Sequence, residues 1–170
     1  MAHPRPPIDS ELVAAAVRLG DRLRANGAQM ASAESCTGGM VGHIITQVPH
    51  ASDHYLGGIV SYADAAKREL LGVDPELLER VGAVSPEVAE AMADGALERF
   101  PTAALAVAVT GIAGPDGGSE DKPVGLVYIA TARRGGAARV ERRVWPHDRD
   151  GNKRASTLLA LELALEGAEA

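Results

Sequence analysis

The sequence has a single cysteine, Cys36, among its 170 residues. An intrachain disulfide is therefore excluded, as are a CxxC redox pair and a zinc site built from cysteines. No apolar run approaches the roughly 20 residues of a membrane-spanning helix, and the opening Met1–Pro7 lacks the apolar segment of a signal peptide. We expect a protein of the reducing cytoplasm with no membrane partner.

Aromatic side chains are also scarce, at 3% of the residues, so alanine, valine, leucine and isoleucine must fill the interior. Basic residues are not gathered beside aromatic ones, and the net charge is −6. This balance argues against nucleic acid as a partner. With 46% apolar residues, the chain is long enough to form one domain with a substantial core.

Hydrophobic periodicity and turn signals predict alternating helices and strands. Helices are expected from Asp9-Ser10 to Asn26-Gly27 and over 38–48, 64–71, 86–100 and 151–165, with a short helical turn after Asp74-Pro75. Strands are expected over 29–33, 55–62, 103–109, 124–131 and 139–145, the last two as an antiparallel hairpin. This order predicts one α/β domain, residues 8–170, folded as a three-layer α/β/α sandwich on a mixed β-sheet. Residues 1–7 are expected to be disordered.

The stretch Met30–Met40 has the pattern of a buried strand that breaks at a small polar turn and continues as a helix, with Ser35 at the bend. Such a turn exposes the serine hydroxyl and directs the N–H groups of the first helical turn toward the same point, where they can hold an anion. Taken alone, Ser35 is better explained as a helix cap, since serine is a preferred capping residue. The following Gly38 and Gly39 narrow the difference between the two interpretations, and both stay open at this point.

Two side chains further along the chain are candidates to activate Ser35. Tyr62 ends the predicted strand 55–62 and Lys67 follows in the first turn of the next helix, so the sheet can bring both to the same edge. To act as a base, Lys67 must lose its proton, and a pKa of about 10.4 leaves it almost fully charged at neutral pH. Burial beside Tyr62 would have to lower that pKa. Otherwise Lys67 is an ordinary surface lysine.

The loop Gly111–Gly118 could hold a phosphate through its N–H groups. It is neither a P-loop nor a dinucleotide fingerprint, and glycines also occur in merely tight turns. Arg149, between two aspartates, either pairs with them at a helix start or reaches an anionic substrate. These two features leave an anion site open as an interpretation.

Cys36 is intrinsically a better nucleophile than serine, but the sequence shows no recognisable histidine partner for it. The alternative is that Cys36 packs as a small apolar group. His50, Asp53 and His54 have metal-ligand spacing, yet they follow a proline in a predicted loop, so we expect no metal site.

Taken together, several ordered blocks of the sequence resemble the CinA C-terminal domain family. They are Ala33–Gly39, Ser61-Tyr62 with Ala66-Lys67, Gly82–Ser85, Thr110–Gly118 and Lys122–Gly125. The similarity extends from about Ser10 to Leu165 and is far more specific than any single motif. Members of this family are nicotinamide mononucleotide (NMN) deamidases.

The resemblance implies hydrolysis of the NMN carboxamide to nicotinic acid mononucleotide and ammonia, a step of pyridine nucleotide salvage, without a metal or other cofactor. By position, Ser35 would be the nucleophile, Lys67 its general base and Tyr62 a residue that orients or relays the proton. The remaining site residues would contact the substrate: Thr37, Gly38, Gly39, Thr110, Gly111, Gly114 and Arg149. We expect a homo-oligomer, with a dimer as the first choice.

Two departures from the family pattern limit what is transferred. Many members carry a large N-terminal domain similar to molybdopterin-binding proteins, which this sequence does not contain, and His147 stands where the family has a glycine. Two other functions stay open: a non-catalytic nucleotide-binding or regulatory module linked to competence or DNA damage, and an amidase for another small amide. The retention of Ser35, Tyr62 and Lys67 together argues against the binding module.

Overall fold

A computed structural model describes residues 5–169, and within them five strands form one mixed sheet. The strands are β1 (Met30–Glu34), β2 (Tyr55–Val60), β3 (Leu105–Gly111), β4 (Leu126–Arg133) and β5 (Arg139–Val144), in the order β2-β1-β3-β4-β5. β1 runs parallel to β2 and β3, whereas β4 runs antiparallel to β3 and β5. The carboxyl ends of β1, β2 and β3 therefore meet at one edge of the sheet.

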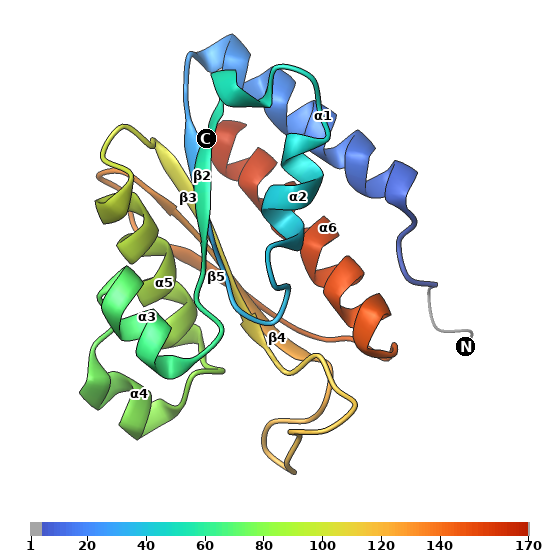
Figure 1. The fold of residues 1–170 in the computed structure, drawn as a ribbon, viewed down its shortest axis with the longest axis vertical. Helices are drawn as coiled ribbons and strands as arrows, with labels where there is room; N and C mark the ends of the chain where they lie inside the picture. Colours follow the sequence, from blue (N-terminus) through green and yellow to red (C-terminus); the bar gives the residue numbers. More distant parts are fainter. Residues whose placement is uncertain (1–4, 170) are drawn as a thin grey trace.

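Helices cover both faces of this sheet (Figure 1). One layer consists of α1 (Asp9–Asn26), α2 (Met40–Thr46) and α6 (Arg149–Glu169), and the other of α3 (Asp64–Leu71), α4 (Pro75–Val81) and α5 (Pro86–Arg99). A short 3-10 helix, Ala51–Asp53, precedes β2. The predicted three-layer α/β/α sandwich on a mixed sheet is confirmed. None of the described helices is both long and apolar enough to cross a membrane.

Small aliphatic side chains fill the core on both sides of the sheet. β3 is buried along almost its whole length. It contributes Val107 and Val109 to the layer under α1, α2 and α6, and Ala106 and Ala108 to the layer under α3, α4 and α5. This alternation follows from the two-residue period of a strand. A continuous apolar run is typical of a strand that is covered on both faces, as the sequence predicts here.

The bounds of two helices differ from the sequence-based expectation: α2 is shorter at both ends, and α6 is longer at both ends and continues to Glu169. Gly38 and Gly39 have φ angles of 63° and 96°, outside the helical range, so α2 begins only at Met40. The last helix begins at Arg149, slightly earlier than predicted. Arg149 is therefore the first residue of α6.

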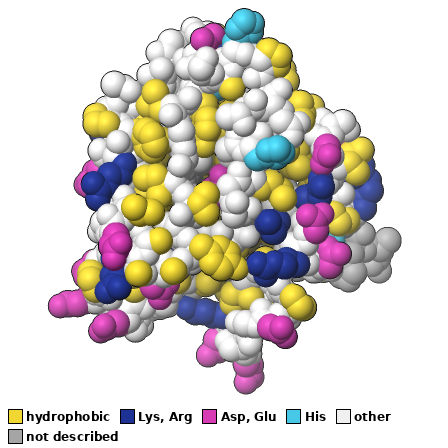
Figure 2. Space-filling view, viewed as in Figure 1, with side chains coloured by type: hydrophobic (Ala, Val, Ile, Leu, Met, Phe, Trp, Pro, Cys, Tyr) yellow, Lys and Arg dark blue, Asp and Glu magenta, His cyan; other side chains and the backbone are white. Residues whose placement is uncertain are grey.

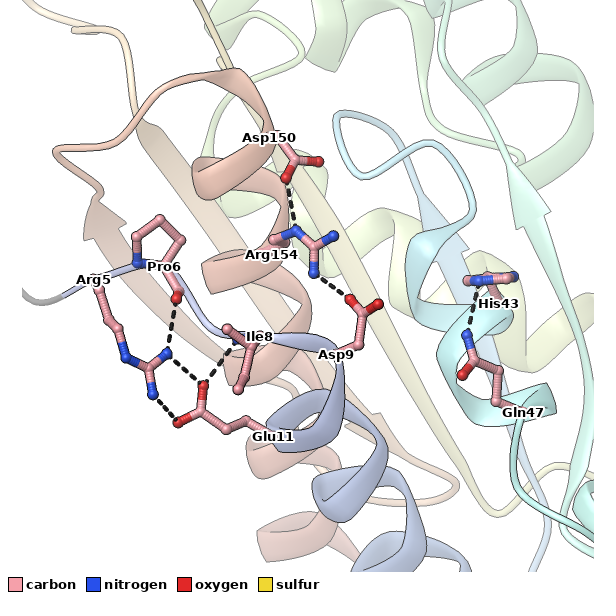
Figure 3. Close-up of polar contacts among 9 residues, drawn as sticks. All are labelled: Arg5, Pro6, Ile8, Asp9, Glu11, His43, Gln47, Asp150 and Arg154. Atoms are coloured by element: carbon pink, nitrogen blue, oxygen red, sulfur yellow. Dashed lines mark hydrogen bonds and ion pairs between the residues drawn. The ribbon is translucent and has the colours of Figure 1, made fainter.

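The first described residues pack beside the start of α1 (Figure 3). Both terminal nitrogens of Arg5 donate to the carboxylate of Glu11, at 2.8 and 2.9 Å. Of the segment predicted to be disordered, residues 1–4 lie outside the described residues. Residues 5–7 are placed, and this contact ties them to the helix that follows.

The starts of α1 and α6 are joined by Arg154 (Figure 3). Its guanidinium lies between the carboxylates of Asp150 on its own helix and Asp9 of α1, and it donates to both. Both aspartates are well exposed, so the pair contributes little to stability. The positive charge of Arg154 is nevertheless paired with two neighbouring carboxylates.

Gly95 marks a close contact between α5 and the end of α3. A Cβ atom at Gly95 would lie 2.1 Å from the carbonyl oxygen of Leu71. In an exposed helix, replacing glycine by alanine stabilises by about 1 kcal/mol. Here we expect Gly95→Ala to lower the free energy of unfolding by about 1–3 kcal/mol, because the two backbones must separate.

Urea unfolding followed by circular dichroism measures this difference. Gly136→Ala is the control, since a Cβ atom at Gly136 would meet other atoms only at ordinary contact distances of 3.6 Å or more. Equal free energies of unfolding for the two variants would contradict the close contact of the helices.

Candidate active site

Ser35 lies at the carboxyl edge of the sheet, directly after β1. Its N–H donates to the carbonyl oxygen of Val109 in β3 at 2.9 Å, so the strand pairing continues one residue past the end of β1. The N–H of Gly38 donates to the carbonyl oxygen of Ser35 at 3.0 Å and closes a tight turn, which requires the positive φ angles of Gly38 and Gly39. Ser35 is thus held from both sides and is 7% exposed.

Lys67 of α3 reaches the hydroxyl of Ser35. Its Nζ donates to Ser35 Oγ at 3.0 Å, to the carbonyl oxygen of Ser61 at 2.8 Å and to that of Tyr62 at 3.2 Å. All three ammonium hydrogens have acceptors, although the residue is only 1% exposed. Burial lowers the pKa of Lys67, and the nearby carboxylate of Asp64 opposes that shift. The burial that a serine–lysine pair requires is therefore present.

Tyr62 contacts Lys67 through its main-chain carbonyl. Tyr62 as a residue is 61% exposed, and its hydroxyl accepts a hydrogen bond from Arg149 Nη2 at 3.0 Å. Nη1 of Arg149 donates to the carbonyl oxygen of Gly114 at 2.6 Å. Arg149 therefore links three segments at this edge of the sheet: the β2–α3 connection, the glycine loop and the start of α6.

The carboxylate of Glu34 occupies the N-terminus of α2. It accepts the N–H groups of Gly39 and Val41 at 3.0 Å, the N–H of Gly42 at 2.9 Å and the hydroxyl of Thr37 at 2.7 Å. Four donors compensate for the burial of this carboxylate, which is 2% exposed. The N–H groups of the first turn of α2 are therefore not free to hold an anion, which differs from the sequence-based expectation.

The free donors lie earlier in the same turn. Among the described residues, the N–H groups of Cys36 and Thr37 donate to no carbonyl, carboxylate or hydroxyl oxygen. They directly follow Ser35, and the residue after the nucleophile is a common source of the N–H that holds an oxyanion. The turn thus leaves donors free next to the serine hydroxyl while Glu34 binds the others.

Thr110 and Gly111 are the last residues of β3, and Gly114 lies in the glycine loop that follows. Thr110 is 1% exposed, and its hydroxyl donates to the carbonyl oxygen of Ala83 at 2.8 Å. A Cβ atom at Gly111 would lie 2.6 Å from the carbonyl oxygen of Leu126, so β3 and β4 pair closely there. Gly114 has a φ of 89° and directs its carbonyl to Arg149. Through these contacts the three residues hold the backbone of the end of β3 and of the glycine loop.

Cys36 lies next to Ser35 in an apolar environment. It is 8% exposed, and burial raises the pKa of its thiol to about 12. The thiolate is the reactive form of cysteine. We expect the folded protein to react with the thiol reagent DTNB at pH 8 at least about 100-fold more slowly than the protein in 8 M urea. Equal rates would show an accessible thiol and reopen Cys36 as a nucleophile.

The histidines with metal-ligand spacing do not form a cluster. Within residues 5–169 no group of three or more His, Cys, Asp or Glu side chains is placed to hold a metal ion. His54 is fully buried under α1, where its ring would collide with a Cβ atom at Gly20. Burial lowers the pKa of His54, and the neighbouring charge of Arg24 acts in the same direction. His54 is therefore a buried packing residue, and its Nδ1 lies 3.3 Å from Arg24 Nη1.

Two charged residues of this region escaped the sequence reasoning. Glu34 could have been suspected, because a charged residue follows an otherwise small and apolar strand. Lys153 lies one helical turn after Arg149, and this spacing puts both on the same face of α6. A Cβ atom at Gly38 would lie 3.8 Å from Lys153 Nζ, so this ammonium is close to the turn of Ser35.

The fold and these contacts define an α/β/α protein with a serine hydroxyl held by a buried lysine at the carboxyl edge of its sheet. The chain belongs to the CinA C-terminal domain family, whose model matches residues 13–167.

Relatives of two lengths share this domain. A CinA-like protein of Akkermansia muciniphila is 53% identical over 131 residues, which cover 77% of this chain and 31% of that protein. The chain thus spans about a third of the length of this relative. The nicotinamide-nucleotide amidohydrolase PncC of Escherichia coli K12 is 44% identical over 154 residues, which cover 91% of this chain and 93% of that protein.

Solved structures share the whole fold. The competence/damage inducible protein CihA of Agrobacterium tumefaciens is 38% identical, with a TM-score of 0.89 over 100% of this chain and 99% of that chain. A CinA superfamily protein of Escherichia coli is 31% identical, with a TM-score of 0.87 over 96% of this chain and 94% of that chain.

Proposed function

We propose that this protein hydrolyses the carboxamide of NMN to nicotinic acid mononucleotide and ammonia, in pyridine nucleotide salvage. The contact of the buried Lys67 Nζ with Ser35 Oγ at 3.0 Å carries the proposal. The 44% identity to the E. coli nicotinamide-nucleotide amidohydrolase, over 91% of the chain, supports the choice of substrate.

In the first step, Ser35 Oγ attacks the amide carbon and its proton passes to neutral Lys67. The carbonyl oxygens of Ser61 and Tyr62 hold Nζ against Oγ, so the transfer needs no rearrangement. The oxyanion accepts hydrogen bonds from the free N–H groups of Cys36 and Thr37.

In the second step, the protonated Lys67 donates its proton to the leaving nitrogen and ammonia departs. Ser35 remains esterified with the nicotinoyl group of the nucleotide. Water then attacks the ester carbon and gives a proton to Lys67, which returns it to Ser35 Oγ as the ester bond breaks. The sum is one amide and one water converted to one acid and one ammonia.

The other expected site residues take supporting roles in this proposal. Tyr62 orients Lys67 through its carbonyl, while its exposed ring, held by Arg149, lines the entrance for the substrate. The remaining expected residues set the shape of the turn and of the loop beside it: Thr37, Gly38, Gly39, Thr110, Gly111 and Gly114.

Ammonia release from NMN by the purified protein, with a chelator present, tests this function. Free nicotinamide and nicotinamide riboside are offered in parallel. We expect ammonia from NMN with the highest kcat/KM. Binding of NMN without ammonia release would favour the nucleotide-binding module, and a preference for free nicotinamide would favour an amidase for small amides.

A homodimer stays a prediction. The exposed edge strand β2 and the residues after it, 55–62, contain no charged side chain, whereas β5 at the other edge carries four. Charged side chains are a common protection of sheet edges against pairing, and β2 lacks them. Light scattering should give twice the 17.6 kDa of the chain, and the mass of a single chain would contradict the dimer.

A further inference from the structure

An uncommitted ammonium lies over the turn that follows Ser35. Lys153 Nζ is 3.8 Å from the position of a Cβ atom at Gly38. Among the described residues, it makes no hydrogen bond and no ion pair, although the side chain is partly buried. Among the described residues, and apart from Gly38 and its two chain neighbours, Lys153 Nζ is the only heavy atom within 4 Å of that Cβ position. The space above Gly38 is therefore open, with a positive charge at its border.

The other cations near this site are already engaged. Arg149 donates to the hydroxyl of Tyr62 and to the carbonyl of Gly114, and all three hydrogens of Lys67 have acceptors. Arg154, next to Lys153 on α6, is paired with two aspartates. Figure 2 shows lysine and arginine side chains at several separate places on the face that is drawn in Figure 1. Unlike Arg149, Lys67 and Arg154, Lys153 has no partner among the described residues and can take an anionic ligand.

Among the described residues, no carboxylate forms an ion pair with Lys153. The carboxylate of Glu34 already accepts four hydrogen bonds from the turn and the start of α2. Asp148 accepts the N–H of Gly151, and Asp150 is paired with Arg154. A partly buried ammonium without a partner loses hydration for no gain in the free protein. An anion that binds over Gly38 would recover that loss.

We propose that Lys153 binds the 5′-phosphate of a pyridine nucleoside monophosphate. This inference rests on the proposed function, which places the carboxamide at Ser35 Oγ. The phosphate stands at the opposite end of NMN, so the ribose extends across the open space above Gly38 toward α6. The ammonium of a lysine is a compact point charge on a flexible side chain. It can therefore follow a phosphate whose position varies.

The test compares NMN with nicotinamide riboside, which has the same carboxamide, ring and ribose but no phosphate. For Lys153→Met we expect KM for NMN to rise about 10–100-fold, because a charged hydrogen bond is lost. The kcat for NMN and the kcat/KM for nicotinamide riboside should stay within about threefold of wild type. Lys153→Arg should retain most of the preference for NMN.

Arg133→Met is the matched control. It removes one positive charge at the opposite edge of the sheet, where Arg133 pairs with Leu105 at the start of β3. We expect unchanged kinetics with both substrates. Inorganic phosphate gives a second readout, because it should inhibit hydrolysis of nicotinamide riboside by wild type and by Arg133→Met, and this inhibition should weaken in Lys153→Gln.

The outcomes separate the inference from the proposed function. Equal losses with NMN and nicotinamide riboside in Lys153→Met would overturn the phosphate role, since Lys153 would then act on a part that both substrates share. Unchanged kinetics with NMN would overturn it as well. A wild-type protein that releases ammonia from neither compound would overturn the proposed function, and the inference with it.

Discussion

Replacing Ser35 by alanine is expected to lower kcat for NMN hydrolysis by at least about 10⁴-fold while the protein stays folded. The hydroxyl of Ser35 is hydrogen-bonded to Lys67, and the main-chain contacts that hold the turn do not involve it. Its loss therefore removes the nucleophile and leaves the turn in place. Ammonia release and circular dichroism measure the two effects on the same samples.

Ser32→Ala provides a matched control for Ser35→Ala. Ser32 lies in β1, three residues before Ser35, and is fully buried, but its hydroxyl bonds to the hydroxyl of Tyr55 at 2.8 Å. We expect Ser32→Ala to retain activity. If Ser35→Ala remained as active as this control, Ser35 could not be the nucleophile and the proposed mechanism would be wrong.

The activity should depend on Lys67 as strongly as on Ser35. Lys67→Met and Lys67→Arg are expected to lose about as much activity as Ser35→Ala, because neither side chain can accept a proton at neutral pH. The double variant Ser35→Ala/Lys67→Met should have a kcat no lower than that of either single variant, since the two residues act as one unit. Additive losses would indicate independent roles.

The pH dependence follows from the state that Lys67 must adopt. The base has to be neutral, so kcat/KM rises with pH up to the pKa of Lys67 and then levels off. Burial lowers that pKa, which places the rise below the ordinary value of 10.5. The carboxylate of Asp64 raises it, so Asp64→Asn should move the rise to lower pH. A rise at or above pH 10.5 would contradict a buried base.

The strand, turn and helix around Ser35 could be predicted from local sequence. The apolar run that ends in β1 and the two glycines after it specify a strand followed by a sharp turn. Lys67 could be placed near Ser35 because β1 and β2 are parallel, and parallel strands bring their carboxyl ends to one edge. These predictions depend on short-range periodicity and on the usual topology of α/β sheets.

The roles of individual hydrogen bonds could not be predicted in this way. Tyr62 was expected to help through its side chain, yet the contact with Lys67 comes from its carbonyl. The donors available at the turn depend on which N–H groups Glu34 binds, and that requires the path of the backbone. Lys153 is distant from Gly38 in sequence, so no local pattern connects them.

Glu34→Gln is expected to lower kcat for NMN about 10²–10³-fold, with a smaller change in KM. One carboxylate oxygen of Glu34 accepts hydrogen bonds from Thr37 Oγ1 and from the N–H groups of Gly39 and Val41. The other oxygen accepts one from the N–H of Gly42. A glutamine has the same shape, but its NH₂ group must face one of these donors. At least one buried donor loses its acceptor in either orientation.

The lost hydrogen bond affects the reaction because Glu34 holds the turn that contains the oxyanion donors. When the carboxylate no longer holds the start of α2, the N–H groups of Cys36 and Thr37 lose their fixed position beside Ser35. Misplaced oxyanion donors reduce stabilisation of the transition state more than binding of the substrate, so the loss appears mainly in kcat. We also expect the free energy of unfolding to fall by about 1–3 kcal/mol.

Two further variants separate these effects. Thr37→Val removes one donor to the carboxylate and leaves the three N–H contacts, so its loss in kcat should be smaller than that of Glu34→Gln. Glu79→Gln removes the same charge at an exposed position of α4 and should change neither quantity. If Glu34→Gln lowered the stability but kept the full kcat, the carboxylate would serve only the fold, and the placement of the oxyanion donors would not depend on it.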